Sequence, residues 1–175
     1  MTQKSSFTLR FPITEVKTWA DKYSYGGDSA LAEEIGRPVR AQRYVTRKQF
    51  LELARWKSPR IVPKCEKNDA DFVEEVTGKA LQSKDERFRV EVLRLLTGVA
   101  WPMASVILHF CHDDDYPILD YRALWSLRVH PVPRYRYELW AEYTRVTREL
   151  AAKARADMRT LDRALWQYSK EKQRG

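Results

Sequence analysis

The sequence predicts an all-α protein, and three observations carry this prediction. Apolar residues recur three and four positions apart in most segments, residues typical of helix caps precede these segments, and no segment alternates apolar and polar residues over several positions. Sustained alternation would indicate β-strands. The 175 residues are 43% hydrophobic, which is sufficient for a buried core without disulfide bonds. We therefore expect a single helical domain over residues 1–175, either undivided or built as two lobes that share the chain.

The start and end of each helix are predicted from local signals. Thr46 and Gln49 have the spacing of a capping box, as do Ser83 and Glu86. Gly36, followed by Arg-Pro, is typical of a helix end. The expected helices cover residues 13–22, 30–35, 46 to about 56, 69 or 70 to about 81, 85–96, 102–110, 121–127, 137–155 and 158–172.

The charge of the chain is basic and unevenly distributed. There are 32 Lys and Arg residues against 24 Asp and Glu, a net charge of +8. Residues 1–67 and 121–175 each carry +7, whereas residues 68–120 carry −6. A basic balance favours an anionic partner, with nucleic acid ahead of an acidic membrane surface. The densest basic stretch, residues 37–67, supplies the candidate nucleic-acid contacts Arg43, Arg47, Lys48, Lys57 and Arg60.

Several classes of protein are excluded by what the sequence lacks. Two cysteines, Cys65 and Cys111, are too few for a disulfide framework, a cysteine-only zinc site or a four-cysteine iron–sulfur cluster. No apolar run approaches the length of a membrane span, and no secretory stretch follows Met1–Ser6, so we expect a cytoplasmic protein. Glycine-rich nucleotide loops and nucleophile elbows are absent. We expect no metal site, because the run Asp113–Asp115 lacks the spacing of a calcium loop.

The most specific segment lies between Val92 and Leu127. A helix ends near Leu96, a tight turn follows, and a second, apolar helix begins with Pro102 at a position that suits proline. Such a helix–hairpin–helix, here over about residues 85–111, points backbone N–H groups and a helix N-terminus outward, and these bind phosphate without reading sequence. The residues expected to contact the DNA backbone are Thr97, Gly98, Val99, Ala100 and Trp101.

This segment resembles the helix–hairpin–helix DNA glycosylase superfamily, which includes the endonuclease III-like, adenine-mismatch and alkylpurine glycosylases. The resemblance rests on Leu96-Thr97-Gly98-Val99-Ala100, on Ala104 with Val106-Ile107-Leu108, and on Pro117-Ile118-Leu119-Asp120. It implies two helical lobes around a cleft and double-stranded DNA as the partner. It also implies that Asp120, at the start of the helix that follows, is the catalytic residue.

Two departures from the family's pattern define the activity that the resemblance implies. Ala100 replaces the second hairpin glycine, and Pro102 occupies the position of the Schiff-base lysine found in bifunctional members. Because proline has no amine, the expected activity is that of a monofunctional base-excision glycosylase. Asp120 would stabilise positive charge on the sugar and orient the attacking water. No cofactor is implied, apart from a monovalent cation held by hairpin carbonyls near Thr97 and Val99.

A base that reacts must leave the stack and enter a pocket. The aromatic candidates to line this pocket or to wedge the duplex are Tyr25, Trp56, Trp101, Tyr121 and Trp125. Four other aromatic residues have the helical spacing that predicts the core of the C-terminal helices. These four are Trp140, Tyr143, Trp166 and Tyr168.

Three functions remain open on the sequence alone: a DNA glycosylase, a catalytically silent DNA-binding protein that retains the fold, and a helical protein-interaction module whose hairpin is only a connection. Asp120 also suits a purely structural role, because it directly precedes a helix and aspartate is a favoured N-cap. Convergence of the basic residues with Gly98 on one face would favour DNA over the module. Asp120 at the floor of a base-sized cavity would favour catalysis over silent binding.

Overall fold

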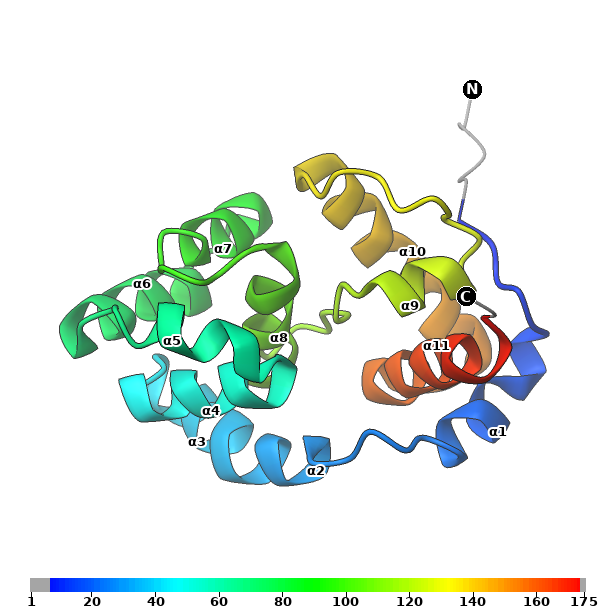
Figure 1. The fold of residues 1–175 in the computed structure, drawn as a ribbon, viewed down its shortest axis with the longest axis horizontal. Coiled ribbons are helices and arrows are strands. Elements are labelled where there is room, and N and C mark those ends of the chain that lie inside the picture. Colours follow the sequence, from blue (N-terminus) through cyan, green and yellow to red (C-terminus); the bar gives the residue numbers. More distant parts are fainter. Residues whose placement is uncertain (1–6, 174–175) are drawn as a thin grey trace. The chain divides into compact units, whose positions relative to one another are not determined.

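The computed structural model describes residues 7–173, and every regular element among them is helical, which confirms the all-α prediction (Figure 1). The chain divides into two compact units. Unit 1 combines residues 1–26 with 117–175, and unit 2 consists of residues 27–116. Met1–Ser6, the segment used to predict a cytoplasmic protein, lies outside the described residues. Within residues 7–173, no helix is both long and apolar enough to cross a membrane.

Unit 2 is built around its last helix. Its elements are α2 (Asp28–Leu31), the π-helical turn η2 (Ala32–Gly36), α3 (Arg37–Gln42), α4 (Arg47–Lys57), the 3-10 turn η3 (Pro59–Ile61), α5 (Val62–Cys65), α6 (Ala70–Gln82), α7 (Glu86–Leu93) and α8 (Trp101–Cys111). Helix α8 contacts α3, α4, α7 and η2, and nine of its eleven residues are buried. This central position explains why α8 has no polar face in the sequence.

The prediction that a helix ends at Gly36 is wrong. The elements α2, η2 and α3 follow one another without a break, so the helix continues through Gly36 and Pro38 to Gln42. Gly36 is buried against α8, where a Cβ atom would clash with the carbonyl oxygen of Phe110, and Arg40 Nη1 donates a hydrogen bond to that oxygen at 2.6 Å. The π-helical turn ends two residues before Pro38, whose missing N–H interrupts the α-helical ladder. The glycine therefore serves close helix packing.

Local capping signals account for other boundaries. Thr46 and Gln49 form the capping box predicted at the start of α4. The box predicted for Ser83 and Glu86 is wrong, because Asp85 takes the N-cap position of α7 and its side chain accepts a hydrogen bond from the N–H of the third helical residue. An aspartate two residues closer to the helix thus replaces the serine as the cap.

Unit 1 joins the start of the chain to its C-terminal helices. Its elements are the 3-10 turn η1 (Ile13–Glu15), α1 (Val16–Asp21), α9 (Tyr121–Ser126), α10 (Tyr137–Ala154) and α11 (Met158–Lys172). The N–H groups of Thr8 and Arg10 donate to carbonyl oxygens at the end of α9, and α11 contacts α1, α9 and α10. Trp140 and Tyr143 are buried as predicted, but Trp166 and Tyr168 are only partly buried.

The net charge of the chain belongs entirely to unit 1. Residues 27–116 carry 15 basic and 15 acidic side chains, whereas residues 1–26 and 117–175 together carry 17 basic and 9 acidic ones. Within unit 2, the acidic loop 113–115 pairs with basic residues: Arg43 lies 2.8 Å from Asp113 and Arg89 lies 2.6 Å from Asp114. The basic stretch at residues 37–67 is therefore balanced within its own unit.

Candidate functional site

The hairpin between α7 and α8 is held by a glycine and an asparagine. Gly98 has a φ angle of +87°, and a Cβ atom there would lie 2.7 Å from Cys65 Sγ, so conformation and close packing both require glycine. Asn68 Nδ2 donates to the Thr97 carbonyl oxygen at 2.9 Å, while the Thr97 N–H donates to Asn68 Oδ1 at 2.8 Å. The same Nδ2 donates to the Cys65 carbonyl oxygen at 2.8 Å. Sequence reasoning missed Asn68, which precedes Thr97 by 29 residues.

The alanine that replaces the second glycine does not strain the turn. Ala100 has φ −97° and ψ −179°, an extended conformation open to any residue, and it is the N-cap of α8. The first helical residue is Trp101 rather than Pro102. Glycine is therefore needed only at Gly98, and the hairpin tolerates alanine two residues later.

The backbone N–H groups of the hairpin fall into two sets. The Thr97 N–H donates to the Asn68 side chain, and the Val99 N–H donates to the Leu96 carbonyl oxygen. Among the described residues, no acceptor is found for the N–H groups of Gly98, Ala100 and Trp101. A cluster of such donors at a turn and helix start is the kind of arrangement that binds an anion.

Two basic side chains lie beside this turn. The Arg94 guanidinium lies 4.3 Å from the centre of the Trp101 ring, and it is exposed. Lys64 is also exposed, and its Cβ lies 3.2 Å from where a Gly98 side chain would begin. Trp101 itself is buried in unit 2, so its ring packs in the core. Only its backbone N–H is part of the hairpin's group of donors.

The five basic residues predicted from the stretch 37–67 have different surroundings. Arg43 is paired with the acidic loop of unit 2. Arg47 donates to the carbonyl oxygens of Asn68 at 3.0 Å and Glu66 at 2.7 Å, so it supports the segment that carries Asn68. The other three are not equally exposed. Lys48 on α4 and Arg60 on η3 are exposed, whereas Lys57 at the end of α4 is half-buried.

Asp120 is the N-cap of α9, and buried groups fix the segment that precedes it. Its Oδ1 accepts a hydrogen bond from the Arg122 N–H at 2.8 Å. The Ile118 N–H donates to Asp162 Oδ2 at 3.0 Å, and the Tyr143 hydroxyl donates to the Ile118 carbonyl oxygen at 2.8 Å. Both backbone groups of the residue two positions before Asp120 are therefore held by α10 and α11.

Three tyrosines of unit 1 interact electrostatically with Asp120. Burial, and then the negative charge of Asp120, raise the pKa of Tyr25 and of Tyr135. Burial raises the pKa of Tyr143 well above its ordinary value, with further contributions from Asp162 and then Asp120. All three phenols are therefore protonated at neutral pH. Tyr135 was not predicted, because it stands in an irregular segment without a motif.

The remaining aromatic candidates divide between the two units. Tyr25 and Tyr121 belong to unit 1 and are 46% and 49% exposed. Trp125, in the same unit, is covered by an arginine side chain 4.2 Å from its ring centre. Trp56 belongs to unit 2, where its ring packs edge-on against Phe110 at 5.3 Å. Tyr25 and Tyr121 therefore share a unit with Asp120 and present exposed rings, whereas Trp56 packs within the unit that carries the hairpin.

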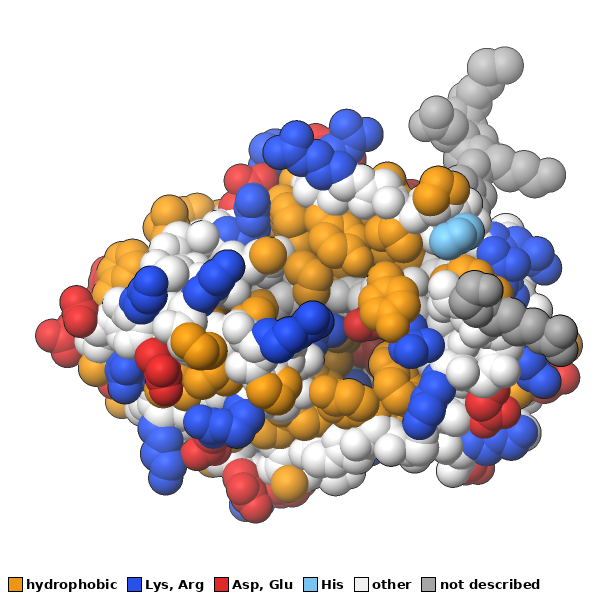
Figure 2. Space-filling model, viewed as in Figure 1, with side chains coloured by type: hydrophobic (Ala, Val, Ile, Leu, Met, Phe, Trp, Pro, Cys, Tyr) orange, Lys and Arg blue, Asp and Glu red, His pale blue; other side chains and the backbone are white. Residues whose placement is uncertain are grey.

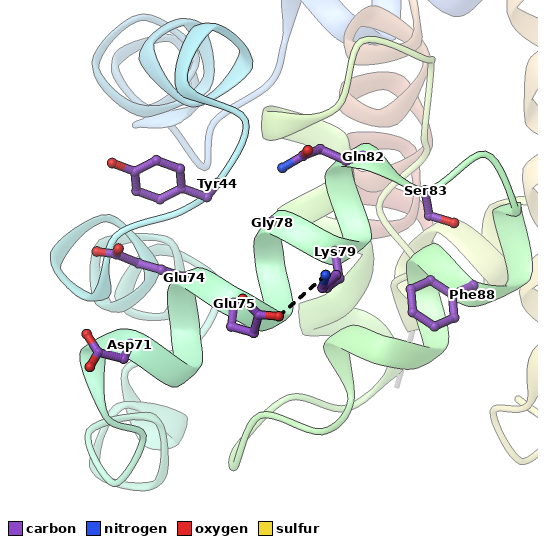
Figure 3. Close-up of a pocket in the computed structure, with 9 residues that line it drawn as sticks. All are labelled: Tyr44, Asp71, Glu74, Glu75, Gly78, Lys79, Gln82, Ser83 and Phe88. Carbon is purple, nitrogen blue, oxygen red and sulfur yellow. Dashed lines mark ion pairs between the residues drawn. The ribbon is translucent and has the colours of Figure 1, made fainter.

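A hollow of about 600 Å³ in unit 2 lies beside α6, between Tyr44 and Phe88 (Figure 3). Three carboxylates line it, those of Asp71, Glu74 and Glu75, against one lysine that pairs with Glu75 at 3.6 Å. This excess of negative charge repels phosphate. We therefore assign the hollow no part in binding nucleic acid.

Metal ligands are not gathered in the described part of the chain, where no group of three His, Cys, Asp or Glu side chains is arranged to hold an ion. The carbonyl oxygen of Thr97, one of the implied ligands of a monovalent cation at the hairpin, accepts a hydrogen bond from the Asn68 amide.

The candidate residues thus form two separate groups, one in each unit. Unit 2 contributes the hairpin with its N–H groups, and unit 1 contributes Asp120 with its tyrosines. Residues 112–119 connect them along the chain. Comparisons of the chain with protein-family models, with curated protein sequences and with solved structures give no match.

Proposed function

We propose that the protein is a monofunctional DNA glycosylase that excises a damaged or modified base. The observation that carries the proposal is the placement of Asp120. Its carboxylate is half-buried at the N-terminus of α9, beside tyrosines, and the chain before it is anchored through Ile118. An ordinary surface cap needs no such anchoring on two other helices.

The chemistry requires a fixed negative charge. As the N-glycosidic bond breaks, its electron pair leaves with the base and positive charge develops on the sugar. Asp120 would stabilise that charge and accept a proton from the water that forms the new bond to the sugar. Tyr25 and Tyr135 would offer ring faces and hydroxyl donors beside the reacting base, since their phenols stay protonated at neutral pH.

The hairpin supports DNA as the partner. The N–H groups of Gly98, Ala100 and Trp101 would bind a backbone phosphate, and Lys64 and Arg94 would add positive charge beside it. Pro102 supplies no amine, so the reaction would leave an intact abasic strand. The division of the chain into two compact units supports the two-lobed arrangement that the resemblance implies.

A second candidate function, silent DNA binding, is favoured by one observation. Asp120 Oδ1 accepts the Arg122 N–H, and this hydrogen bond alone gives the aspartate a structural role. A protein of this kind would bind DNA through the hairpin and release no base.

Base release from modified DNA separates these functions. The protein would be incubated with duplexes that carry uracil, alkylated purines, oxidised bases or modified cytosines, and mass spectrometry would measure free base and intact abasic strand. Release of a base supports the glycosylase. Salt-sensitive binding without release from any duplex supports silent binding. Gly98→Asp places a negative charge at the turn and is expected to weaken binding to all sequences alike.

A further inference from the structure

Helix α11 presents a stripe of basic and aromatic side chains. Arg159, Arg163, Trp166 and Lys170 are separated by four, three and four residues, and this spacing places them on one side of the helix. Each of the four is at least partly exposed. Figure 2 shows basic side chains next to hydrophobic ones over the region of α11.

Aromatic rings from the segment after α1 pack against this stripe. Tyr23 and Tyr25 meet the Trp166 ring edge-on, with centres 5.5 and 5.4 Å away. Lys170 Nζ lies 5.2 Å from the centre of the same ring and also donates to Ser24 Oγ at 2.7 Å. The loop that carries both tyrosines is thus tied to α11.

Two guanidinium groups, that of Arg163 on the stripe and that of Arg122 on α9, also lie over these rings. Arg122 lies 5.6 Å from the Trp166 ring centre, and Arg163 lies 5.6 Å from that of Tyr23. We call this the aromatic–basic surface, and it lies wholly within unit 1. Its members are Tyr23, Tyr25, Arg122, Arg163, Trp166 and Lys170.

The composition of this surface matches one class of ligand. The positive groups suit phosphates, and the ring of Tyr25, 46% exposed, together with that of the neighbouring Tyr121, 49% exposed, suits the flat faces of bases. Bases show these faces only where they are unpaired, since a duplex hides them in its stack. The unit that carries the surface also carries the whole net charge of the chain, and positive charge attracts a nucleic-acid backbone.

We propose that the aromatic–basic surface binds an unpaired segment of a DNA strand, with bases stacked on its tyrosines and phosphates held by Arg122, Arg163 and Lys170. This proposal rests on the proposed function only for the choice of DNA as the polymer. It specifies that the substrate presents unpaired nucleotides to unit 1.

The test is fluorescence anisotropy with a labelled single strand of about 12 thymidines, a length within the site sizes of single-strand binding modules. Tyr25→Ala removes a ring, and Tyr25→Phe is its control because the ring is kept. Lys170→Gln removes a charge from the surface, and Lys153→Gln removes an exposed charge from the end of α10. Thermal melts would establish that each variant is folded.

The wild type is expected to bind this strand in a salt-dependent manner. Tyr25→Ala should weaken binding about tenfold, a typical effect of losing one stacked base. Arg163→Gln combined with Lys170→Gln should also reduce the salt slope by about 1.4, the value for two phosphate contacts on a single strand. The two control variants should bind as the wild type does.

No binding of the thymidine strand, equal binding by Tyr25→Ala and wild type, or tighter binding of the matching RNA strand would each overturn the proposal. The thymidine strand carries no damaged base, and the experiment measures binding without base release. A protein without glycosylase activity can therefore still confirm or overturn this proposal. Conversely, base release without single-strand binding would support the proposed glycosylase function and contradict the role proposed for the aromatic–basic surface.

Discussion

Asp162 of α11 accepts a hydrogen bond at 3.0 Å from the backbone N–H of Ile118, two residues before Asp120. Asp162 is only 5% exposed, so its carboxylate is largely removed from water. Burying a carboxylate is unfavourable unless it is well bonded. The hydrogen bond therefore fixes the segment that leads into α9 against α11. By fixing this segment, it also orients the Asp120 side chain.

Replacement of Asp162 tests this link. Asp162→Ala leaves the Ile118 N–H without its acceptor and is expected to lower the free energy of unfolding by about 1–3 kcal/mol. The rate of base release should fall more than DNA affinity, because the loss of position affects Asp120 rather than the hairpin. Asp162→Asn keeps an acceptor oxygen and should restore most of the rate. If the alanine variant released base at the wild-type rate, Asp162 would not position Asp120.

Gly26 and Gly98, two of the three described glycines with positive φ angles, provide a matched pair for testing the hairpin. Gly26 has φ +79° with open space around it, whereas Gly98 has φ +87° and closely approaches Cys65. Gly26→Ala is expected to lower the free energy of unfolding by about 1–2 kcal/mol, the conformational term alone. Gly98→Ala should lower it by at least about 1 kcal/mol more, because the hairpin must also move away from α5. Urea unfolding measures both, and equal losses would refute the packing constraint.

Asn68 should contribute to stability through three hydrogen bonds to backbone groups. Asn68→Ala is expected to lower the free energy of unfolding by about 1–3 kcal/mol. Asn68→Asp should lose at least as much, because its second oxygen would face the carbonyl oxygens of Thr97 and Cys65, where the amide now donates. DNA affinity should weaken in both variants as the hairpin loosens. An aspartate variant as stable as the wild type would show that these two donations contribute nothing.

The capping box of α4 and the bounds of α10 and α11 could be predicted because their signals are local. A capping residue and an apolar stripe determine such boundaries without reference to the rest of the chain. The continuation of the helix through Gly36 could not be predicted. Glycine is required there because the Phe110 carbonyl oxygen on α8, far along the chain, leaves no room for a side chain. Local signals fail where packing against a distant segment decides.

The candidate functional residues show the same contrast between local signals and contacts with distant segments. Gly98 was identified because a turn between two helices favours glycine, and the structure gives it a positive φ angle. The role of Asn68 could not be predicted, because its partner Thr97 lies 29 residues later and is brought to it only by folding. Asp162 carried a usable signal: it stands with Met158 and Leu165 on the buried stripe of α11, where an unpaired carboxylate would be unfavourable. Trp166 was assigned to the core because its spacing alone does not show which side of the helix is covered.

Stability should depend on pH through His112. Its Nδ1 accepts the Asp114 N–H at 2.8 Å, so the 3.7 Å approach of Nδ1 to the Asp114 carboxylate is not an ion pair of a charged ring. Burial, and then the charge of Arg89, lower the pKa of His112 in the folded state. The unfolded chain therefore takes up a proton first, at about the ordinary pKa of 6.5. The stability due to neutral His112 is present above that pH and is lost as the pH falls through the lower, folded-state pKa.

Urea unfolding at about pH 7.5 and about pH 5 measures this dependence. His112→Gln should lose less stability between the two pH values than the wild type, since the titrating ring is gone. His130→Gln is the control, because His130 is exposed, and it should follow the wild type. Equal pH dependence in His112→Gln and wild type would exclude the buried histidine as the cause.

We propose that Asp120 is catalytic as well as a cap, and Asp120→Asn tests this claim most directly. Asparagine caps a helix as well as aspartate does, whereas Asp120→Ala should lower the free energy of unfolding by about 1 kcal/mol. The measurement is the single-turnover rate of base release by wild type and Asp120→Asn on the same duplex, with melting temperature and DNA affinity determined in parallel. We expect the asparagine variant to bind and melt like the wild type and to release base at least about a hundredfold more slowly. Release at the wild-type rate by a folded, DNA-binding Asp120→Asn protein would contradict the claim and leave Asp120 as a cap alone.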